Sequence, residues 1–243
     1  MQNAPIVPSL PASLPTRLRD ETRELHTAAE RSRFMNTLLR GSMLRPAYCA
    51  LLRNLHAIYA VLEPALTRHA TDPVLAPVLT AAVRPALWRS ATLVADLQQL
   101  HGAGWAEAIA LQATTERYLQ RLHGLSATRP ELLLAHAYVR YLGDLSGGQV
   151  LSRIVAGSLA GWAPSMATAA VAFYDFGDAA QTLALTQAFR AGLNAVRVDA
   201  STADALVAEA RLAFELHSAL FDDLALACGL VNAEPAQAAL ASA

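Results

Sequence analysis

The 243-residue sequence contains no lysine, and all 19 of its basic residues are arginine. This absence excludes any mechanism that depends on a catalytic lysine, such as Schiff-base chemistry. Only two cysteines occur, Cys49 and Cys228, far apart and within helical patterns, so we expect free thiols in a reducing compartment. No apolar run approaches the roughly 20 residues that span a bilayer. The sequence therefore predicts a cytoplasmic protein with no membrane partner.

Charge is scarce as well. Charged residues make up 16% of the chain and the formal net charge is -1, whereas 54% of the residues are hydrophobic. A nearly neutral chain has no overall positive field to attract nucleic acid. So much apolar side chain is also unlike the composition of disordered proteins. We therefore expect a folded domain and no nucleic-acid partner.

The two ends of the chain differ from the rest. Residues 1–15 contain four prolines and little apolar periodicity, which predicts a disordered, extended lead. Residues 231–243 are rich in alanine and predict a flexible tail. The folded domain is therefore expected to occupy residues 16–230.

The spacing of apolar residues between these ends predicts an all-α domain. Apolar side chains recur every three or four residues, and alternating β-branched runs are almost absent. No internal repeat is visible, so a single helical bundle is expected. Prolines and breaks in the pattern place the helices at residues 17–40, 46–69, 74–83, 86–101, 103–124, 130–158, 165–174, 180–197 and 201–230.

The first predicted helix carries a polar stripe. Arg19, Arg23, His26 and Glu30 follow helical spacing and share one edge of the apolar face. A lone histidine cannot complete a zinc site, but one axial histidine is enough for haem, and arginine pairs well with propionate carboxylates. The alternative is a surface His26–Glu30 pair flanked by solvated arginines. The stripe alone leaves both interpretations open.

A second group of residues lies in the predicted helix 130–158. Gly143, Gly147 and Gly148 each cost about 1 kcal/mol relative to alanine inside a helix, so they need a structural or functional reason. Glycines on one face let a flat ligand approach the backbone, and they permit a kink. Asp144 and Arg140 lie beside that face. The alternative is a close helix crossing with an Arg140–Asp144 ion pair.

The ten residues from Arg140 to Gln149, RYLGDLSGGQ, resemble the distal-helix motif of the haem oxygenase family. Within this family, the protein is expected to be of the soluble, bacterial type, since the sequence shows no apolar C-terminal anchor. This resemblance implies one domain in which haem lies between a proximal helix at about 17–40 and a glycine-kinked distal helix at about 130–158. Further similarity covers residues 18–35, 54–63, 117–123, 130–138 and 209–223.

The resemblance also implies roles for individual residues. His26 is expected to be the proximal iron ligand, with Glu30 as its neighbour, while Gly143 and Gly147 place the distal backbone against the porphyrin. Asp144 is expected to hold a distal water and deliver a proton. Tyr59 and Arg140 are expected to complete that hydrogen-bonded network. The remaining implied contacts are with the propionates, through Arg19, Arg23, Tyr138 and Arg190, and with the pocket walls, Phe214 and Phe221.

Two positions depart from the family pattern. Thr186 stands one turn before Arg190, where many members have a lysine, so one propionate anchor is expected to be missing. His217 replaces an asparagine, which changes the local polarity. Neither departure touches the expected core chemistry.

The activity implied by the resemblance is oxidative cleavage of haem to biliverdin, carbon monoxide and ferrous iron. Haem b, with its iron, would be both substrate and prosthetic group, and dioxygen the co-substrate. No nucleotide or flavin motif is visible, so a ferredoxin or flavodoxin with its reductase is expected to supply electrons. Two alternatives remain: a haem carrier or sensor that leaves the ring intact, and a purely structural helical protein.

Overall fold

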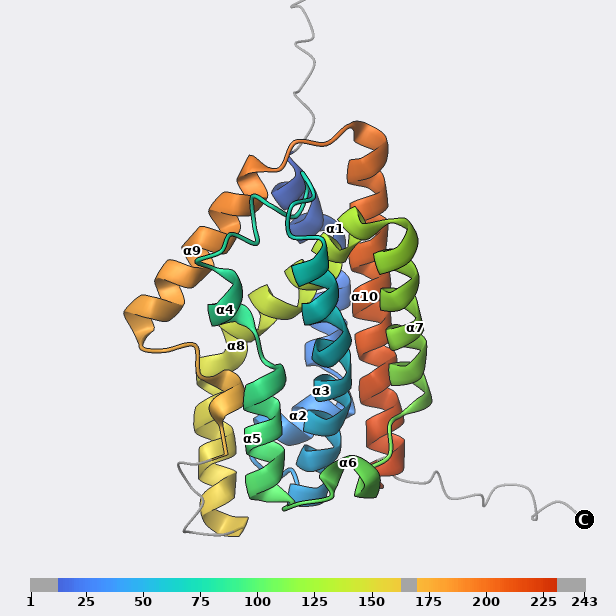
Figure 1. Ribbon diagram of the computed structural model, residues 1–243. Helices are drawn as coiled ribbons and strands as arrows, with labels where there is room; N and C mark the ends of the chain where they lie inside the picture. The colour runs from blue at the N-terminus through green and yellow to red at the C-terminus, as the bar shows by residue number, and fades with distance from the viewer. Residues whose placement is uncertain (1–12, 163–169, 231–243) are drawn as a thin grey trace, which may run out of the picture.

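Residues 13–162 and 170–230 are described in a computed structural model, and every regular element within them is a helix (Figure 1). The prediction of an all-α protein is confirmed. The helices are α1 (Leu14–Glu30), α2 (Arg33–Leu39), α3 (Arg45–Arg68), α4 (Arg84–Leu87), α5 (Ser90–Leu100), α6 (Trp105–Ala108), α7 (Ala113–Thr128), α8 (Leu133–Trp162), α9 (Ala179–Ala195) and α10 (Ala200–Ala227), with short 3-10 turns η1 (Pro130–Leu132) and η3 (Ala172–Tyr174).

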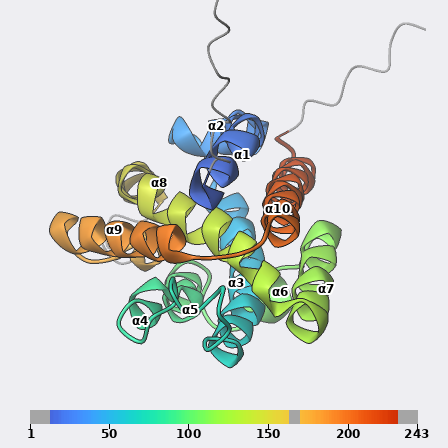
Figure 2. The ribbon, with the colours of Figure 1, turned by 90° about the horizontal axis from the view of Figure 1, so that it is seen from above.

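The long helices share one core. α3 packs against α5 and α7, while α10 packs against α1, α7 and α8. Seen from above, α8 crosses the middle of the bundle, and α10 packs against both α8 and α1 (Figure 2). The largest side chains that are fully buried come from five helices and include four tyrosines: Phe34, Tyr48, Tyr59, Tyr118, Tyr141 and Phe189.

The predicted helix 17–40 is wrong as one element, because the chain breaks between Glu30 and Arg33. Ser32 has extended backbone angles and its hydroxyl accepts a hydrogen bond from the Met35 amide at 3.3 Å. Serine is a favoured helix N-cap for this reason, so a new helix begins there. α1 itself begins at Leu14, two residues before the predicted start of the domain, while residues 1–12 lie outside the described part of the chain.

α8 is continuous from Leu133 to Trp162, as the prediction for 130–158 required. Figures 1 and 2 both show it changing direction part-way along, in agreement with the kink predicted for its glycine segment. A Cβ atom on Gly148 would lie 3.6 Å from the Tyr174 carbonyl oxygen. Gly148 therefore brings α8 close to η3, whose residues form part of the site described below.

Two other predicted helices are wrong. Residues 74–83 form turns rather than an α-helix; Pro77, inside this segment, lacks an amide hydrogen and its ring crowds the preceding turn of a helix. The predicted helix 103–124 is divided into α6 and α7, because the backbone is extended at Ile109 and Gln112 between them. Half of the predicted helix 165–174 and the whole tail 231–243 lie outside the described residues. The described half, residues 170–174, holds only the 3-10 turn η3, so an α-helix there is wrong.

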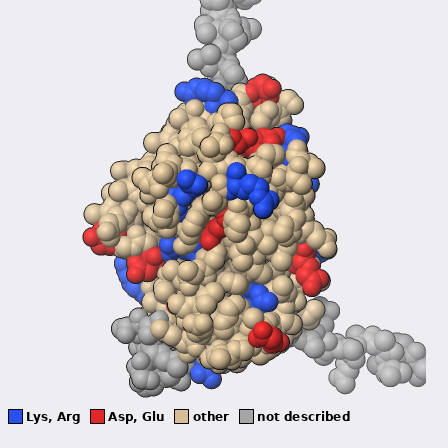
Figure 3. All heavy atoms as spheres, viewed as in Figure 1, with Lys and Arg blue, Asp and Glu red and all other residues tan. Residues whose placement is uncertain are grey.

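The remaining predicted helices are confirmed within a few residues of their ends. These are 46–69, found at Arg45–Arg68; 180–197, found at Ala179–Ala195; 201–230, found at Ala200–Ala227; and 86–101, found at Ser90–Leu100 with α4 as a separate turn before it. On the face shown in Figure 3, acidic and basic side chains are interspersed. That distribution agrees with the nearly neutral composition of the chain.

Candidate functional site

A cleft opens where α1 and α8 both pack against α10. The cleft is open to solvent and holds about 830 Å³ of space, and an adjoining open hollow of about 670 Å³ shares His26, Val139, Gly143 and Phe214 with it. All the residues predicted for the site except Tyr59 line one of these two spaces. In the cleft are His26, Glu30, Arg140, Gly143, Asp144, Gly147, Phe214 and Phe221, and the hollow adds Arg19, Arg23, Tyr138 and Arg190.

His26 stands on α1 at the edge of the cleft. Its Nδ1 atom lies 3.7 Å from a Glu30 carboxylate oxygen, which leaves Nε2 free of that contact. The imidazole packs edge-on against Phe214, with ring centroids 5.7 Å apart. About half of the His26 side chain is exposed, which agrees with the alternative of a surface His26–Glu30 pair. The ring nevertheless also lines the cleft. The geometry therefore leaves a ring nitrogen for a ligand bound there.

The opposite wall is the glycine segment of α8. A Cβ atom on Gly143 would meet no atom within 4 Å, and one on Gly147 would meet only the Leu151 side chain, at 3.9 Å. No neighbouring helix therefore requires glycine at these two positions, which argues against the close helix crossing as their explanation. The absence of side chains instead keeps the backbone of α8 accessible from the cleft.

A hydrogen-bonded network lies behind this glycine wall. Arg140 donates from Nε to the Tyr59 hydroxyl at 3.0 Å and from Nη2 to Asp144 at 2.9 Å. The Tyr59 hydroxyl donates to the other Asp144 oxygen, and Arg140 Nη1 donates to His217 Nε2. Tyr59 is fully buried, so it contributes to the site through Asp144 rather than by lining the cleft. The structure thus brings together the three residues predicted to be catalytic.

The Asp144 carboxylate is poorly solvated. Its side chain is about 10% exposed, and burial raises its pKa although the nearby Arg140 charge acts to lower it. A raised pKa brings a carboxyl group closer to accepting and releasing protons near neutral pH. The Tyr59 hydroxyl, whose pKa burial raises well above 10.0, stays protonated and serves as a donor.

Basic side chains gather at the hollow beside the cleft. α1, α8 and α9 each contribute to it, so residues far apart in the sequence meet there. The Thr186 hydroxyl donates to the Thr182 carbonyl oxygen at 2.8 Å within α9, so it does not replace a lysine as an anchor for anions. The polar residues that line the hollow are Arg19, Thr22, Arg23, His26, Tyr138, Ser146 and Arg190.

A family model described as "Heme oxygenase" matches residues 12–223. "Heme oxygenase 1" of Homo sapiens is 37% identical over 216 residues, which cover 89% of this chain and 73% of the human one. "Heme oxygenase 1" of a Nostoc species is 35% identical, with 88% and 86% covered. The chain belongs to the haem oxygenase family. The predicted family is thereby confirmed.

The fold agrees with this assignment. The crystal structure of heme oxygenase-1 from the cyanobacterium Synechocystis, in complex with heme, matches with a TM-score of 0.79 and 31% sequence identity, covering 90% of this chain and 97% of that one. The protein is therefore an enzyme that degrades haem, and the alternative of a haem carrier or sensor is not favoured. No helix among the described residues combines the length and apolarity needed to cross a bilayer.

One wall of the cleft comes from residues that sequence analysis did not single out. Phe173 and Tyr174 of η3 line the cleft. The fully buried Asp96 carboxylate accepts hydrogen bonds from the amides of Ala172 and Phe173, at 2.9 and 2.8 Å. Arg89 donates to the carbonyl oxygens of Phe173 and Asp175. Asp96 thus binds amide groups of the η3 segment and Arg89 binds its carbonyl oxygens, so the two side chains together fix its position.

Asp96 could have been noticed from the sequence. It stands among Leu93, Leu97 and Leu100 on the apolar face of the helix 90–100, where a carboxylate needs a specific partner. Burial raises the pKa of Asp96 to about 6, although both amides favour its charged form. Its partners lie more than 70 residues away in the chain, so the pattern alone could not identify them.

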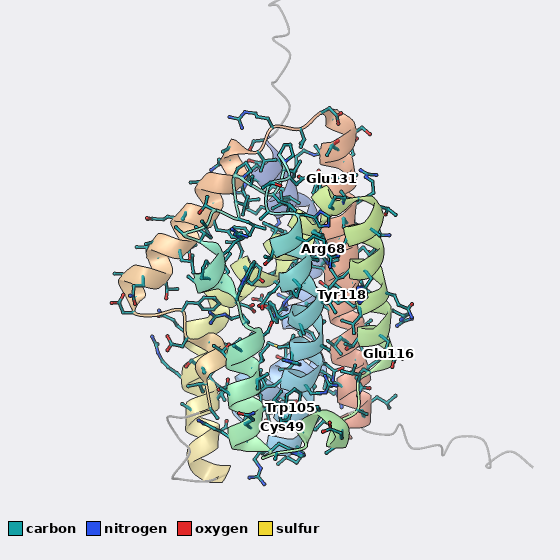
Figure 4. All side chains as sticks on the ribbon, in the orientation of Figure 1. Cys49, Arg68, Trp105, Glu116, Tyr118 and Glu131 are labelled. Carbon is teal, nitrogen blue, oxygen red and sulfur yellow. The ribbon has the colours of Figure 1, made fainter. Side chains whose placement is uncertain are left out.

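A second buried network lies behind the site, between α7, α8 and α10. His136 interacts through Nδ1 with the Tyr118 hydroxyl and through Nε2 with Glu209, each at 2.9 Å, and Arg121 donates to Glu209 at 2.9 Å from Nε. Tyr118 lies at mid-height on α7, beside α3 and α10 (Figure 4). A carboxylate only accepts, so the His136 proton is on Nε2 and the Tyr118 hydroxyl donates to Nδ1. The network ties three helices together.

We expect this network to make the free energy of unfolding depend on pH in the acidic range. Burial acts to raise the pKa of Glu209, but hydrogen bonds from Arg121 and His136 outweigh it and lower the pKa from 4.5 to about 2. A depressed folded-state pKa adds stability that is present above pH 4.5 and is lost as the pH falls toward 2, by about 3 kcal/mol in all.

The Glu209→Gln variant should therefore lose about 3 kcal/mol of unfolding free energy at pH 7 relative to the wild type, and this difference should shrink toward pH 2. Denaturant unfolding of the ligand-free protein across this range measures it. Glu215→Gln, an exposed position on the same helix, is the control and should change little. A Glu209→Gln difference that stays constant with pH would contradict the assigned ionisation.

Proposed function

We propose that this haem oxygenase binds haem b in the cleft, with His26 as the axial ligand of the iron, and opens it oxidatively to biliverdin, carbon monoxide and ferrous iron. The observation that carries the proposal is the arrangement of His26 on α1 opposite the bare backbone of Gly143 and Gly147 on α8. A flat ligand fits between an imidazole and a helix surface without side chains. Bound haem would supply both the metal that activates dioxygen and the ring that is oxidised.

The polar groups around the cleft match the chemistry of haem. One imidazole suits an axial position, and the arginines of the hollow suit two propionates, because a guanidinium pairs with a carboxylate through parallel hydrogen bonds. Phe214 and Phe221 provide apolar walls, and Phe221 stacks on Phe34 with centroids 6.1 Å apart. The proposed propionate anchors are Arg19, Arg23, Tyr138 and Arg190. Glu30 would orient the His26 ring through its Nδ1 side.

Asp144 has the proposed role of handling the proton that ring opening needs. Its carboxylate borders the cleft beside the glycine wall, and Tyr59 and Arg140 fix both of its oxygens. It is too short to reach across to a metal held by His26, so it would act through a water molecule held in the cleft. Arg140 keeps the carboxylate in place by charge and by hydrogen bonding.

Electrons are proposed to come from a ferredoxin or flavodoxin with its reductase. Arg19, Arg23 and Arg190 are exposed at the open end of the hollow, where an acidic donor protein could approach the haem edge. Local positive charge of this kind steers acidic partners, even though the whole chain is almost neutral. Removing the charge of Arg19 or Arg190 should lower the rate at limiting donor concentration.

The direct test is to add haemin to the purified protein in air, with a ferredoxin and its reductase, and to follow the Soret absorption together with product chromatography. Loss of the Soret band with formation of one biliverdin isomer supports the proposal and identifies the ring carbon attacked. A stable haem complex that releases no bilin with several competent donors would contradict it, and would favour a carrier or sensor.

A leucine at Gly143 tests the glycine wall. The side chain would enter the open space above α8, so the affinity for haemin should fall at least about tenfold. The unfolding free energy should not decrease, because leucine favours a helix by up to about 1 kcal/mol relative to glycine. Absorbance titration with haemin and thermal unfolding measure the two effects.

Gly157→Leu is the matched control for this substitution. It lies in the same helix, its Cβ would also meet no atom within 4 Å, and it does not line the cleft. It should gain similar stability without losing haemin affinity. Equal affinity losses in both variants would show that the effect comes from the helix and not from the cleft.

A further inference from the structure

His217 is a buried histidine that directly contacts the proposed proton-handling network. It lies on α10, is 4% exposed, and lines the cleft near Phe214 and Phe221. Its ring packs edge-on against Tyr118 and Phe221, with centroids 5.7 and 5.8 Å away. These aromatic contacts hold the imidazole plane in one orientation.

Each nitrogen of Arg140 has its own acceptor. Nε donates to Tyr59, Nη2 donates to Asp144, and Nη1 donates to His217 Nε2. A guanidinium has donors only, so His217 Nε2 must be the unprotonated, accepting nitrogen. The neutral ring then carries its proton on Nδ1, where the backbone of Ala213, one turn earlier on α10, favours a proton.

The surroundings of His217 keep the ring neutral. The charged and titratable groups that face it are Arg140 and His136 from α8 and Tyr118 from α7. Burial, followed by the Arg140 charge, lowers the pKa of His217 well below its usual value of 6.5. None of these neighbours supplies a negative charge that would favour an imidazolium, so Nε2 remains an acceptor over the working pH range.

We propose that His217 is a positioning residue for haem cleavage: its Nε2 atom accepts the third Arg140 donor and so fixes the guanidinium that holds Tyr59 and Asp144 beside the cleft. Without this acceptor, Arg140 would keep a buried donor unpaired, which costs free energy, so a rotation of the guanidinium towards another acceptor would be favoured. Any rotation of the guanidinium would change both contacts with Asp144 and Tyr59. The inference rests on the proposed function, in which Asp144 handles the proton.

The tautomer can be tested without haem or turnover. Nitrogen-15 NMR of the ring nitrogens in the ligand-free protein, with the His217 signals assigned by their loss in His217→Asn, should show a neutral ring protonated at Nδ1 from about pH 6 to 8. A ring protonated at Nε2, or an imidazolium in this range, would overturn the proposal whatever the activity is.

Turnover then separates positioning from a merely structural role. His217→Leu should lower kcat roughly tenfold, as losses of outer-sphere partners do, with haemin affinity within about twofold of the wild type. Its pH profile should move to higher pH, because a displaced Arg140 lowers the pKa of Asp144 less. His217→Asn, whose amide oxygen can also accept, should restore most of kcat and the original pH profile.

The exposed His123→Leu variant on α7 is the control and should behave as the wild type. If the wild-type protein forms no biliverdin, the proposed function is wrong. The NMR test still shows whether His217 Nε2 accepts a hydrogen bond from Arg140. If the wild type turns over and His217→Leu matches it in kcat and pH profile, the positioning role is wrong. Should His217→Leu not fold, the tautomer and the pH profile of His217→Asn decide.

Discussion

The His26→Ala variant is expected to lose biliverdin formation by more than about 100-fold, since even outer-sphere partners of metal ligands are worth about 10- to 100-fold. Of the two histidines that line the cleft among the described residues, His217 already accepts a hydrogen bond from Arg140 through Nε2, whereas Nε2 of His26 is free of the contact with Glu30. The Soret band of the haemin complex should shift, because this variant would lack the imidazole proposed as the axial ligand of the iron.

The fold of this variant should remain intact, because about half of the His26 side chain is exposed and it supports no buried hydrogen bond. Circular dichroism and thermal unfolding check this. Added imidazole can occupy the space left by the side chain and should restore part of the activity. His123→Ala, at an exposed position on α7, is the matched control. A normal biliverdin yield from His26→Ala would contradict the assignment of His26 as the axial ligand.

The Asp144→Ala variant should bind haemin normally yet form biliverdin at least about 100-fold more slowly, which is the usual loss when a positioned proton-transfer group is removed. The carboxylate lies beside the cleft, and its loss leaves the His26 side untouched. Reductant and dioxygen should still be consumed, so the amount of reductant used per biliverdin should rise steeply. Spectroscopic titration, oxygen uptake and product chromatography measure these quantities.

Asp222→Ala, which removes an exposed carboxylate from α10, is the control for net charge and should keep normal coupling between reductant and product. Stability needs separate measurement, because Asp144→Ala leaves Arg140 without its carboxylate partner and costs several kcal/mol when a buried charge is unpaired. Unchanged biliverdin formation and coupling in a folded Asp144→Ala protein would refute the proposed role.

The sequence predicted local features of the site well. Arg19, Arg23, His26 and Glu30 do share one edge of α1, because residues three and four apart on a helix are neighbours. The open space above Gly143 agrees with an unusual need for glycine at that point of α8. Such features depend on helical periodicity alone, so spacing along the chain is enough to find them.

Contacts between distant segments could not be predicted in the same way. Asp96 and Arg89 hold η3 across more than 70 residues, and His217 meets Arg140 across 77. Nothing in the local pattern around these residues identifies their partners. The break after Glu30 was also missed, since a serine within a helical pattern is a common residue and only the packing of α2 makes Ser32 a cap.

By itself, the sequence determined that the protein is all-α, that it belongs to the haem oxygenase family, and that one histidine and one glycine segment are the parts to examine. Only the tertiary structure decided that these parts face each other across one cleft, and that Arg140 links Tyr59, Asp144 and His217. The physical reason is that periodicity sets which side chains share a helix face, whereas the packing of α1 and α8 against α10 sets which faces meet.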